Sequence, residues 1–421
     1  MKRNTVTGGI LFLLIACIPH GLIAQQKHKL RRDPALLQTI ESSLRESVNQ
    51  YKALARQLPP GQMPRTWENG RLMTVANNSW ISGFYPGALM YLFEFSKDTA
   101  IQREAFERVA LMEPMKNLTS HHDLGFMMYC SYGNAYRLTG NEEYKKILVR
   151  AAQSLATRFD PRVGCIKSWN GIKSLDGKQY FTFPVIIDNM MNLELLFFAS
   201  KVTGDAYFRD IAIKHSETTL QHHLRPDFSS YHVLNYDVET GLPVNKETHQ
   251  GFSNNSTWSR GQAWGIYGFT MVFRETKDKR FLEAACKLAD HFIDHPNLPA
   301  DKIPYWDFNV NQPGFVPQWN YDPAKYPEVP RDASAAAITA SALIELAGYV
   351  DKKLAQKYFG AAEAMLKSLS SPPYRTSGTE AGGMLLKHGC GGVPGNVEVD
   401  VPLTYADYYY VEAMMRYRNG K

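Results

Sequence analysis

Two aspartates stand where a carboxyl group is expensive to bury. Asp188 follows three β-branched apolar residues (185–187) and leads into a stretch that is apolar almost all round, and Asp123 follows a pair of histidines. Burying an unpaired carboxylate costs roughly several kcal/mol, so such a group is normally paired, protonated or functional. Two neighbouring carboxyl groups push one pKa up, which gives a general acid that holds its proton near neutrality. Helix capping is the structural alternative for Asp188.

Aromatic and polar residues gather near two further predicted helix starts. Trp80 and Phe84 are four residues apart and share one face of a helix start, and Trp258, Arg260 and Trp264 follow within seven residues of one another. Rings of this kind stack on the faces of sugars, and arginine can hold a carboxylate through two parallel hydrogen bonds. The residues therefore fit a sugar platform, although core aromatics beside an exposed arginine would give the same pattern.

Other chemistries find less support in the sequence. It contains no GxSxG, P-loop or HExxH motif, and its adjacent histidine pairs would point to opposite sides of a helix. The net charge of +6 comes without a Lys/Arg run or a nucleic-acid-binding signature, which argues against nucleic acid and is compatible with a small anionic substrate. Four dispersed cysteines form no zinc or redox motif and favour buried free thiols, while export would permit a disulfide: Cys130, Cys165, Cys286 and Cys390.

The first 26 residues have the features of a signal peptide. Lys2 and Arg3 precede an apolar stretch that is too short to span a membrane. Cleavage after Ala24 is one route, and lipid attachment at Cys17 within a bacterial lipoprotein-like box is the other; we favour the first. Either route predicts a periplasmic or secreted protein whose residues 27–421 form a single domain.

Five short turns divide the rest of the chain into paired segments. Each ends in an aspartate or asparagine, the residue types that begin helices: Asp98, Asn141, Asp205, Asp278 and Asp351. This recurrence predicts helix pairs. We expect twelve helices, at residues 34–57, 83–96, 100–117, 122–138, 142–159, 188–202, 205–221, 258–275, 279–293, 333–349, 353–369 and 404–418.

The predicted helices alternate in character along the chain. One set is rich in Gly, Ala, Met and aromatic residues, whereas the other is amphipathic. A helix without a polar face is one that other helices surround. The alternation predicts an all-α fold, an (α/α)6 barrel of six inner helices ringed by six outer ones, closed by pairing of the N-terminal helix with the C-terminal one.

In such a barrel the inner helices begin at one end, and their positive dipole ends favour an anionic ligand there. The unusual residues described above lie at these helix starts. Two long loops, residues 225–257 and 298–331, would form walls at the same end, because loops of about 30 residues are rare unless functional. His232 and Gln250 lie in the first of them.

Five stretches form a specific combination of motifs: NNSWISGFYPGAL, HHDLGFMMYCSYGNAYRLTG, VIIDNMMNLELL, HQGFSNNSTWSRGQAWGIYG and PRDASAAAITASALIEL. Together they closely resemble glycoside hydrolase family 88, the unsaturated glucuronyl hydrolases, from about residue 34 to residue 418. The resemblance implies an (α/α)6 barrel. It also implies a substrate left by a polysaccharide lyase, with a 4,5-unsaturated uronic acid at its non-reducing end.

The resemblance further implies hydration of the C4=C5 enol ether rather than attack at the anomeric carbon. Asp188 would protonate C4 and then, as a carboxylate, take a proton from the water that attacks C5, while Asp123 would tune and position it. The walls around the unsaturated ring would be Trp80, Phe84, Trp258 and Trp264, and its polar contacts His232, Gln250 and Arg260. Residues Gly383–Asn396 would help to form the subsite of the next sugar.

No metal and no organic cofactor is implied by this chemistry, and the partner would be a small anionic oligosaccharide, with glycosaminoglycan fragments as the leading class. The protein would be a monomer or a simple homo-oligomer without a membrane span. Two alternatives remain at this point. One is an unsaturated rhamnogalacturonyl hydrolase acting on pectin fragments, and the other is a non-catalytic helical sugar-binding lipoprotein.

Overall fold

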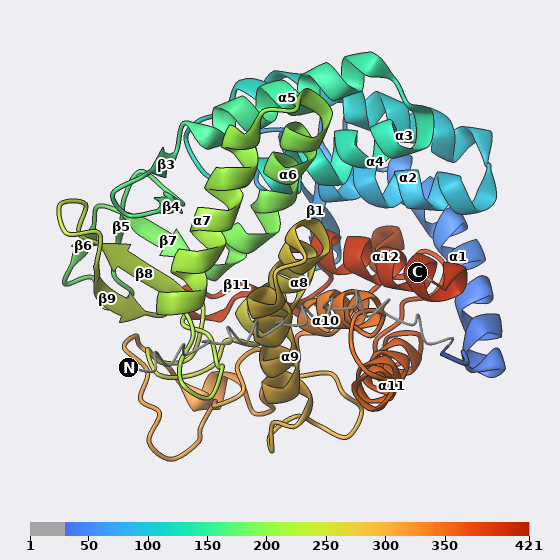
Figure 1. Ribbon diagram of the computed structural model, residues 1–421. Coiled ribbons are helices and arrows are strands. Elements are labelled where there is room, and N and C mark those ends of the chain that lie inside the picture. Colours follow the sequence, from blue (N-terminus) through green and yellow to red (C-terminus); the bar gives the residue numbers. More distant parts are fainter. Residues whose placement is uncertain (1–29, 421) are drawn as a thin grey trace, which may run out of the picture.

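The computed structural model describes residues 30–420, and most of them are helical (Figure 1). The expected signal peptide lies outside the described residues. One set of helices is buried in the core: α2 (Phe84–Ser96), a π-helix continued by α4 (Gly125–Gly133, Asn134–Thr139), a 3-10 helix continued by α6 (Ile187–Asn192, Leu193–Thr203), α8 (Ser259–Thr276), α10 (Ala333–Leu346) and α12 (Thr404–Asn419). The outer helices are α1 (Pro34–Ala55), α3 (Thr99–Leu111), α5 (Glu142–Ala156), α7 (Ala206–His222), α9 (Lys279–Ile293) and α11 (Lys352–Leu369).

The inner helices contact one another in a closed cycle. Helix α2 packs on the π-helix, which packs on α6; the 3-10 turn before α6 contacts α8, and α8, α10, α12 and α2 follow in order. Each outer helix packs on its inner neighbour, and α1 contacts both α12 and α2. This arrangement is consistent with an α/α toroid, and it confirms the expected contact between the N-terminal and C-terminal helices.

The turns between helices behave as the sequence predicts. All five residues expected as N-caps accept a hydrogen bond from a backbone N–H of the following turn: Asp98, Asn141, Asp205, Asp278 and Asp351. Four of the preceding helices end on a left-handed residue, at Lys97, Gly140, Gly204 and Lys277. Left-handed C-caps followed at once by polar N-caps produce the tight reversals of helical hairpins.

Three predicted helices are not continuous α-helices. The expected helix 100–117 ends at Leu111 and is followed by a 3-10 turn (Glu113–Asn117), because Pro114 cannot continue an α-helix. The expected helix 122–138 begins as a π-helix, and the expected helix 188–202 begins as a 3-10 helix. Both irregular turns belong to the segments that carry Asp123 and Asp188, and helical irregularities of this kind are frequent at functional sites.

Short strands decorate the helices, which the all-α prediction did not include. They are β1 (Met63–Glu68), β2 (Arg71–Val75), β3 (Phe159–Asp160), β4 (Cys165–Ile166), β5 (Ile172–Lys173), β6 (Tyr180–Phe181), β7 (Pro184–Ile186), β8 (Val233–Tyr236), β9 (Pro243–Glu247), β10 (Gly389–Gly392) and β11 (Val397–Val401). Strands β7, β8 and β9 form one antiparallel sheet, and the other strands pair as hairpins. Strands β3 to β9 gather at one side of the molecule (Figure 1). The loop 225–257, expected to be structureless, therefore contains β8 and β9.

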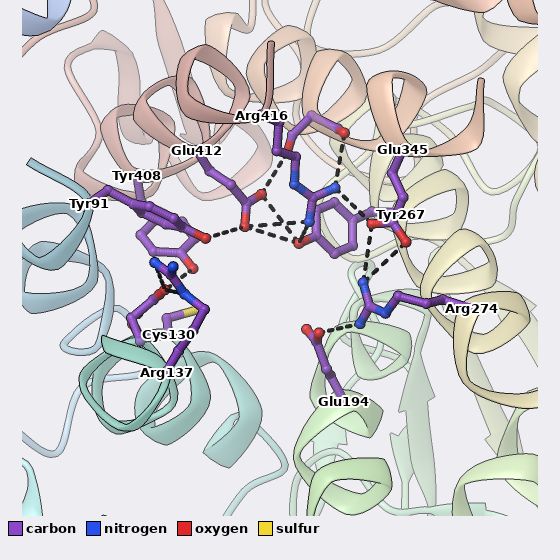
Figure 2. A network of polar contacts seen from close by, with 12 residues as sticks. Tyr91, Cys130, Arg137, Glu194, Tyr267, Arg274, Glu345, Tyr408, Glu412 and Arg416 are labelled. Carbon is purple, nitrogen blue, oxygen red and sulfur yellow. Dashed lines mark hydrogen bonds and ion pairs between the residues drawn. The ribbon is translucent and has the colours of Figure 1, made fainter. Parts of the chain in front are cut away.

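A network of charged residues joins the inner helices at the ends where they terminate (Figure 2). Arg416 on α12 donates to Glu345 on α10 at 2.8 Å and to the Tyr267 hydroxyl on α8 at 2.8 Å. Arg274 bonds both Glu345 and Glu194, which links α8 to α10 and α6. The network borders a cavity of about 370 Å³ between the inner helices. These ion pairs therefore tie α6, α8, α10 and α12 to one another.

Two further findings concern the chain as a whole. Within residues 30–420 no helix is long and apolar enough to cross a membrane. The described cysteines are all free, and three of them are buried: Cys130, Cys165 and Cys390, with Cys286 partly exposed. The interpretation as free thiols rather than disulfides is thus confirmed for these four.

Candidate active site

Asp188 reaches its position through strand pairing. Strand β7 pairs with β8 so that Ile186 faces Val233, and the Ile187 N–H donates to the His232 carbonyl at 3.1 Å. The helical turn begins one residue before Asp188, with Ile186 in the capping position and no side-chain cap bond, so the capping alternative for Asp188 is wrong. The residue is only 7% exposed.

Burial raises the pKa of Asp188 to about 7, mainly because the charged form loses its hydration. The negative charge of Asp123 pushes in the same direction, and the positive charge of Arg260 opposes it. Near neutral pH the Asp188 carboxyl group can therefore exist in both its protonated and its ionised form. A group in this state can give a proton and take one back, as a general acid and base must.

His232 faces Asp188 with a defined ring nitrogen. Its Nδ1 accepts hydrogen bonds from the backbone N–H groups of His249 at 2.9 Å and Gln250 at 3.1 Å. The ring proton therefore sits on Nε2, which lies 3.8 Å from Asp188 Oδ1. Burial lowers the pKa of His232 well below its usual range, so the imidazole is a neutral donor near neutral pH.

Asp123 is equally buried, and its carboxylate lies beside two imidazoles. His121 Nδ1 lies 3.0 Å from one carboxylate oxygen and His122 Nε2 lies 3.4 Å from the other. Burial by itself would raise the pKa of Asp123, but the two histidines outweigh it and the net pKa is lowered. Asp123 is thus ionised near neutral pH, whereas Asp188 can exist there in both forms. The expected pair of acids with separated pKa values is present.

Three buried polar atoms converge without a partner. Among residues 30–420, Asp188 Oδ1, His232 Nε2 and Trp264 Nε1 have no hydrogen bond that satisfies standard geometry. The Trp264 indole N–H also approaches the Asp188 carboxyl and lowers its pKa. Buried polar groups normally have hydrogen-bond partners. Two N–H groups without an acceptor, from His232 and Trp264, beside a carboxyl group therefore make this a candidate position for a polar ligand.

The aromatic residues form one layer beneath these groups. Trp80 contacts Phe84 at 5.8 Å and Tyr405 at 5.2 Å between ring centroids, and Phe126 contacts Trp264 at 5.1 Å. Phe84 is fully buried and packs within the layer against Phe126 and Tyr405. Trp80 keeps partial exposure.

Trp258 and Arg260 link His232 to the aromatic layer. Trp258 lies 4.5 Å from the His232 ring, and the Arg260 guanidinium lies over Trp258 at 4.6 Å and over Tyr405 at 5.2 Å. Its donors go to protein atoms: the Asp332 carboxylate at 3.0 Å, the Gly391 carbonyl at 2.6 Å and the Cys390 carbonyl. Arg260 therefore joins the site through its charge and stacking, with its fork already engaged.

Gln250 is turned toward the same backbone as Arg260. Its amide donates to the Gly391 carbonyl at 2.9 Å. The loop that carries it is anchored by Asp307, a buried carboxylate that accepts from the Phe252 N–H at 2.9 Å and from Ser256 Oγ at 2.7 Å. The loop 298–331 therefore anchors the loop 225–257 through Asp307. Strand β10 is bound by both Gln250 and Arg260.

The structure brings all nine residues expected in the site into one connected region. Sequence reasoning missed four participants: His121, His122, Phe126 and Tyr405. It treated the adjacent histidines as structural, on the expectation of a helix from residue 122, yet both rings lie near Asp123 because this segment precedes the helix and His121 pairs with Trp169 in a β-bridge. Their direct adjacency to Asp123 in the sequence was the available signal. Within residues 30–420 no group of three or more His, Cys, Asp or Glu is arranged to hold a metal ion.

Comparison with known proteins identifies the family of the chain. The family model Glycosyl Hydrolase Family 88 matches residues 57–419. The chain belongs to this family. An unsaturated glucuronyl hydrolase of Formosa agariphila is 43% identical over 346 residues, which cover 82% of this chain and 81% of the relative. An unsaturated glucuronyl hydrolase of Bacillus sp. GL1 is 34% identical, over 82% of this chain and 87% of that one.

Solved structures agree with the sequence comparison. The crystal structure of an unsaturated glucuronyl hydrolase specific for heparin has a TM-score of 0.83 and 43% identity, and covers 91% of this chain and 97% of that one. The unsaturated glucuronyl hydrolase from Bacillus sp. GL1 has a TM-score of 0.80 and 30% identity, with 90% and 96% covered. This protein is accordingly a glycoside hydrolase of the unsaturated glucuronyl hydrolase type.

Proposed function

We propose that the protein removes the 4,5-unsaturated uronic acid from the non-reducing end of oligosaccharides produced by polysaccharide lyases. The observation that carries this proposal is the buried Asp188, with an unpaired oxygen that faces His232 Nε2 at 3.8 Å and with its pKa raised to about 7. A hydration of an enol ether needs a proton donor and a proton acceptor at one place, and a group with a pKa near 7 can be both.

In the first step, Asp188 donates its proton to C4 and the C4=C5 π-electrons form the new C–H bond. Positive charge develops at C5 and is shared by the ring oxygen. The negative charges of Asp123 and of the newly formed Asp188 carboxylate stabilise this cation. The neutral His232 and the Trp264 N–H offer donors to the sugar without adding a positive charge beside it.

In the second step, water attacks C5 and gives a proton to the Asp188 carboxylate, which restores the starting form of the enzyme. The product is a hemiketal at C5, which opens and releases the remaining sugar as its leaving group. No bond to the anomeric carbon is attacked by the protein, so the spacing rule for retaining and inverting carboxylate pairs does not apply to this pair.

Glycosaminoglycan fragments are the proposed substrate class. Support comes from the relatives: a heparin-specific unsaturated glucuronyl hydrolase at 43% identity, and the unsaturated chondroitin disaccharide hydrolase of Streptococcus pyogenes at 33% identity over 84% of both chains. The roles of Trp80, Trp258, Gln250 and Arg260 toward this sugar are part of the proposal. So are the full (α/α)6 barrel description and export from the cytoplasm.

Ultraviolet absorbance of the conjugated uronate tests the proposal directly. Purified protein is mixed with lyase-generated unsaturated disaccharides from heparin, heparan sulfate, chondroitin sulfate, hyaluronan and pectin. Loss of absorbance with a glycosaminoglycan disaccharide is the expected result and names the substrate. Loss only with the pectin fragment would point to rhamnogalacturonyl hydrolysis, and binding without any loss would favour a sugar-binding protein.

A further inference from the structure

Asp332 is a buried carboxylate that the reaction described above does not use. It precedes α10, is fully inaccessible, and divides its two oxygens between two tasks. Oδ1 accepts from the Ser334 N–H at 3.0 Å and from Ser334 Oγ at 2.5 Å, which caps the helix. Oδ2 accepts from Arg260 Nη1 at 3.0 Å. Capping requires only the first oxygen, so the second needs its own explanation.

The Arg260 guanidinium is the positive charge that bears on Asp188. It is 1% exposed and therefore poorly screened by water. The other charged or titratable side chains that face Asp188 are Asp123, just before the π-helix, and His232, just before β8. Because Asp123 is anionic and His232 neutral, Arg260 is the one cation among these groups.

An uncompensated arginine beside the acid would oppose the proposed chemistry. A nearby positive charge stabilises a carboxylate and lowers its pKa by about 1–3 units when it lies within about 4–6 Å. A general acid shifted in that way would lose its proton before it could react at neutral pH. Arg260 is nevertheless buried in the site, where its plane stacks on Trp258 and Tyr405.

We propose that Asp332 is a positioning residue: it holds the Arg260 fork toward the β10 carbonyls, and its carboxylate offsets the charge of the guanidinium beside the site of Asp188. The inference rests on the proposed function of Asp188. It explains why the fork is engaged by one full negative charge and two carbonyl oxygens, from Cys390 and Gly391, and not by Asp188 itself. The same guanidinium thus binds strand β10 through these two carbonyl oxygens.

The test is the pH dependence of kcat/KM in Asp332→Asn between about pH 5 and pH 9. Asparagine keeps the capping oxygen but removes the charge. The alkaline limb, which reports loss of the Asp188 proton, is expected to move to lower pH by about one unit relative to wild type. Asp332→Glu, which keeps the charge, is expected to move the limb back toward its wild-type position.

The matched control is Asp351→Asn, the same change at the N-cap of the outer helix α11, and it leaves the limb where it is. Arg260→Gln is expected to move the alkaline limb of kcat/KM in the opposite direction, to higher pH. If Asp332→Asn does not fold, this variant tests whether the charge of Arg260 acts on Asp188. A purely structural role for Asp332 would lower activity equally at every pH, and a folded variant with an unmoved limb overturns the inference. Absence of wild-type turnover on every disaccharide would instead overturn the proposed function.

Discussion

Replacement of Asp188 by asparagine is expected to abolish catalysis and yet stabilise the fold. The burial that raises the pKa of this carboxyl group also makes its ionised form unfavourable in the folded protein. The pKa of Asp188 is about 7 in the folded protein against an ordinary value of 3.8. The folded state binds this proton more tightly than the unfolded state does. The stability gained from binding this proton is therefore complete below about pH 4 and is lost as the pH rises through 7.

The size of the effect follows from the two pKa values. A difference between 3.8 and about 7, at about 1.4 kcal/mol per pH unit, corresponds to about 4 kcal/mol. Asparagine is nearly isosteric and does not ionise, so Asp188→Asn is expected to be more stable than wild type by up to this amount at pH 8. For a domain of this length, that corresponds to a melting temperature higher by about 5 °C.

Thermal unfolding of both proteins from about pH 4 to pH 8 provides the measurement, together with turnover of an unsaturated disaccharide. The difference in melting temperature should be largest at pH 8 and close to zero at pH 4, while turnover falls by about 10²-fold or more, the value typical of a general acid. A variant that is destabilised at pH 8, or that keeps more than about a tenth of the wild-type rate, would refute the reasoning about Asp188.

Three further predictions address other parts of the molecule. Asp123→Asn is expected to lower kcat by about 10²-fold and to move the alkaline limb of the pH profile to lower pH, because the charge of Asp123 raises the pKa of Asp188; a limb that stays in place would argue that the two acids are not coupled. Trp264→Phe keeps an aromatic ring but removes the indole N–H, which has no described hydrogen-bond partner of standard geometry, so the melting temperature should change little. The value of kcat/KM should fall by about tenfold, as for the loss of one hydrogen bond to a ligand, and an unchanged kcat/KM would show that Trp264 does not bind the substrate. Arg416→Met leaves the buried Glu412 carboxylate with hydroxyl partners in place of a cation and leaves Glu345 with Arg274 still bound, and it should destabilise the protein by about 3–5 kcal/mol. Chemical denaturation measures this loss, and a kcat/KM per folded molecule that falls with stability would show that the network also serves the reaction.

The local features of the fold could be predicted because they depend on short stretches of sequence. Asp98 and Asp278, for example, cap helices at the expected residues, since capping involves only the next two or three residues. The mixed helical character of the turn after Asp123 could not be predicted in the same way. It depends on close packing against α6, where the Gly125 position leaves no room for a side chain beside the Asn192 backbone.

The members of the site followed from the motifs, but their orientation did not. His232 meets Asp188 because β7 pairs with β8, a contact between segments more than forty residues apart along the chain. Arg260 was expected to reach the substrate carboxylate with its fork, a role that stays a prediction. The structure shows that fork bound to Asp332 and to β10, partners that no local pattern around Arg260 indicates.

The closed cycle of inner helices sets the order in which the molecule can be completed. Helix α12 follows every other described helix in the chain, yet it lies between α10 and α2 in the core and also receives α1. Until residues 404–419 are in place, α2 and α10 each expose an apolar side, and the aromatic layer lacks Tyr405 and Tyr409. The ring of inner helices is therefore closed, and the aromatic layer complete, only when the last described helix has packed.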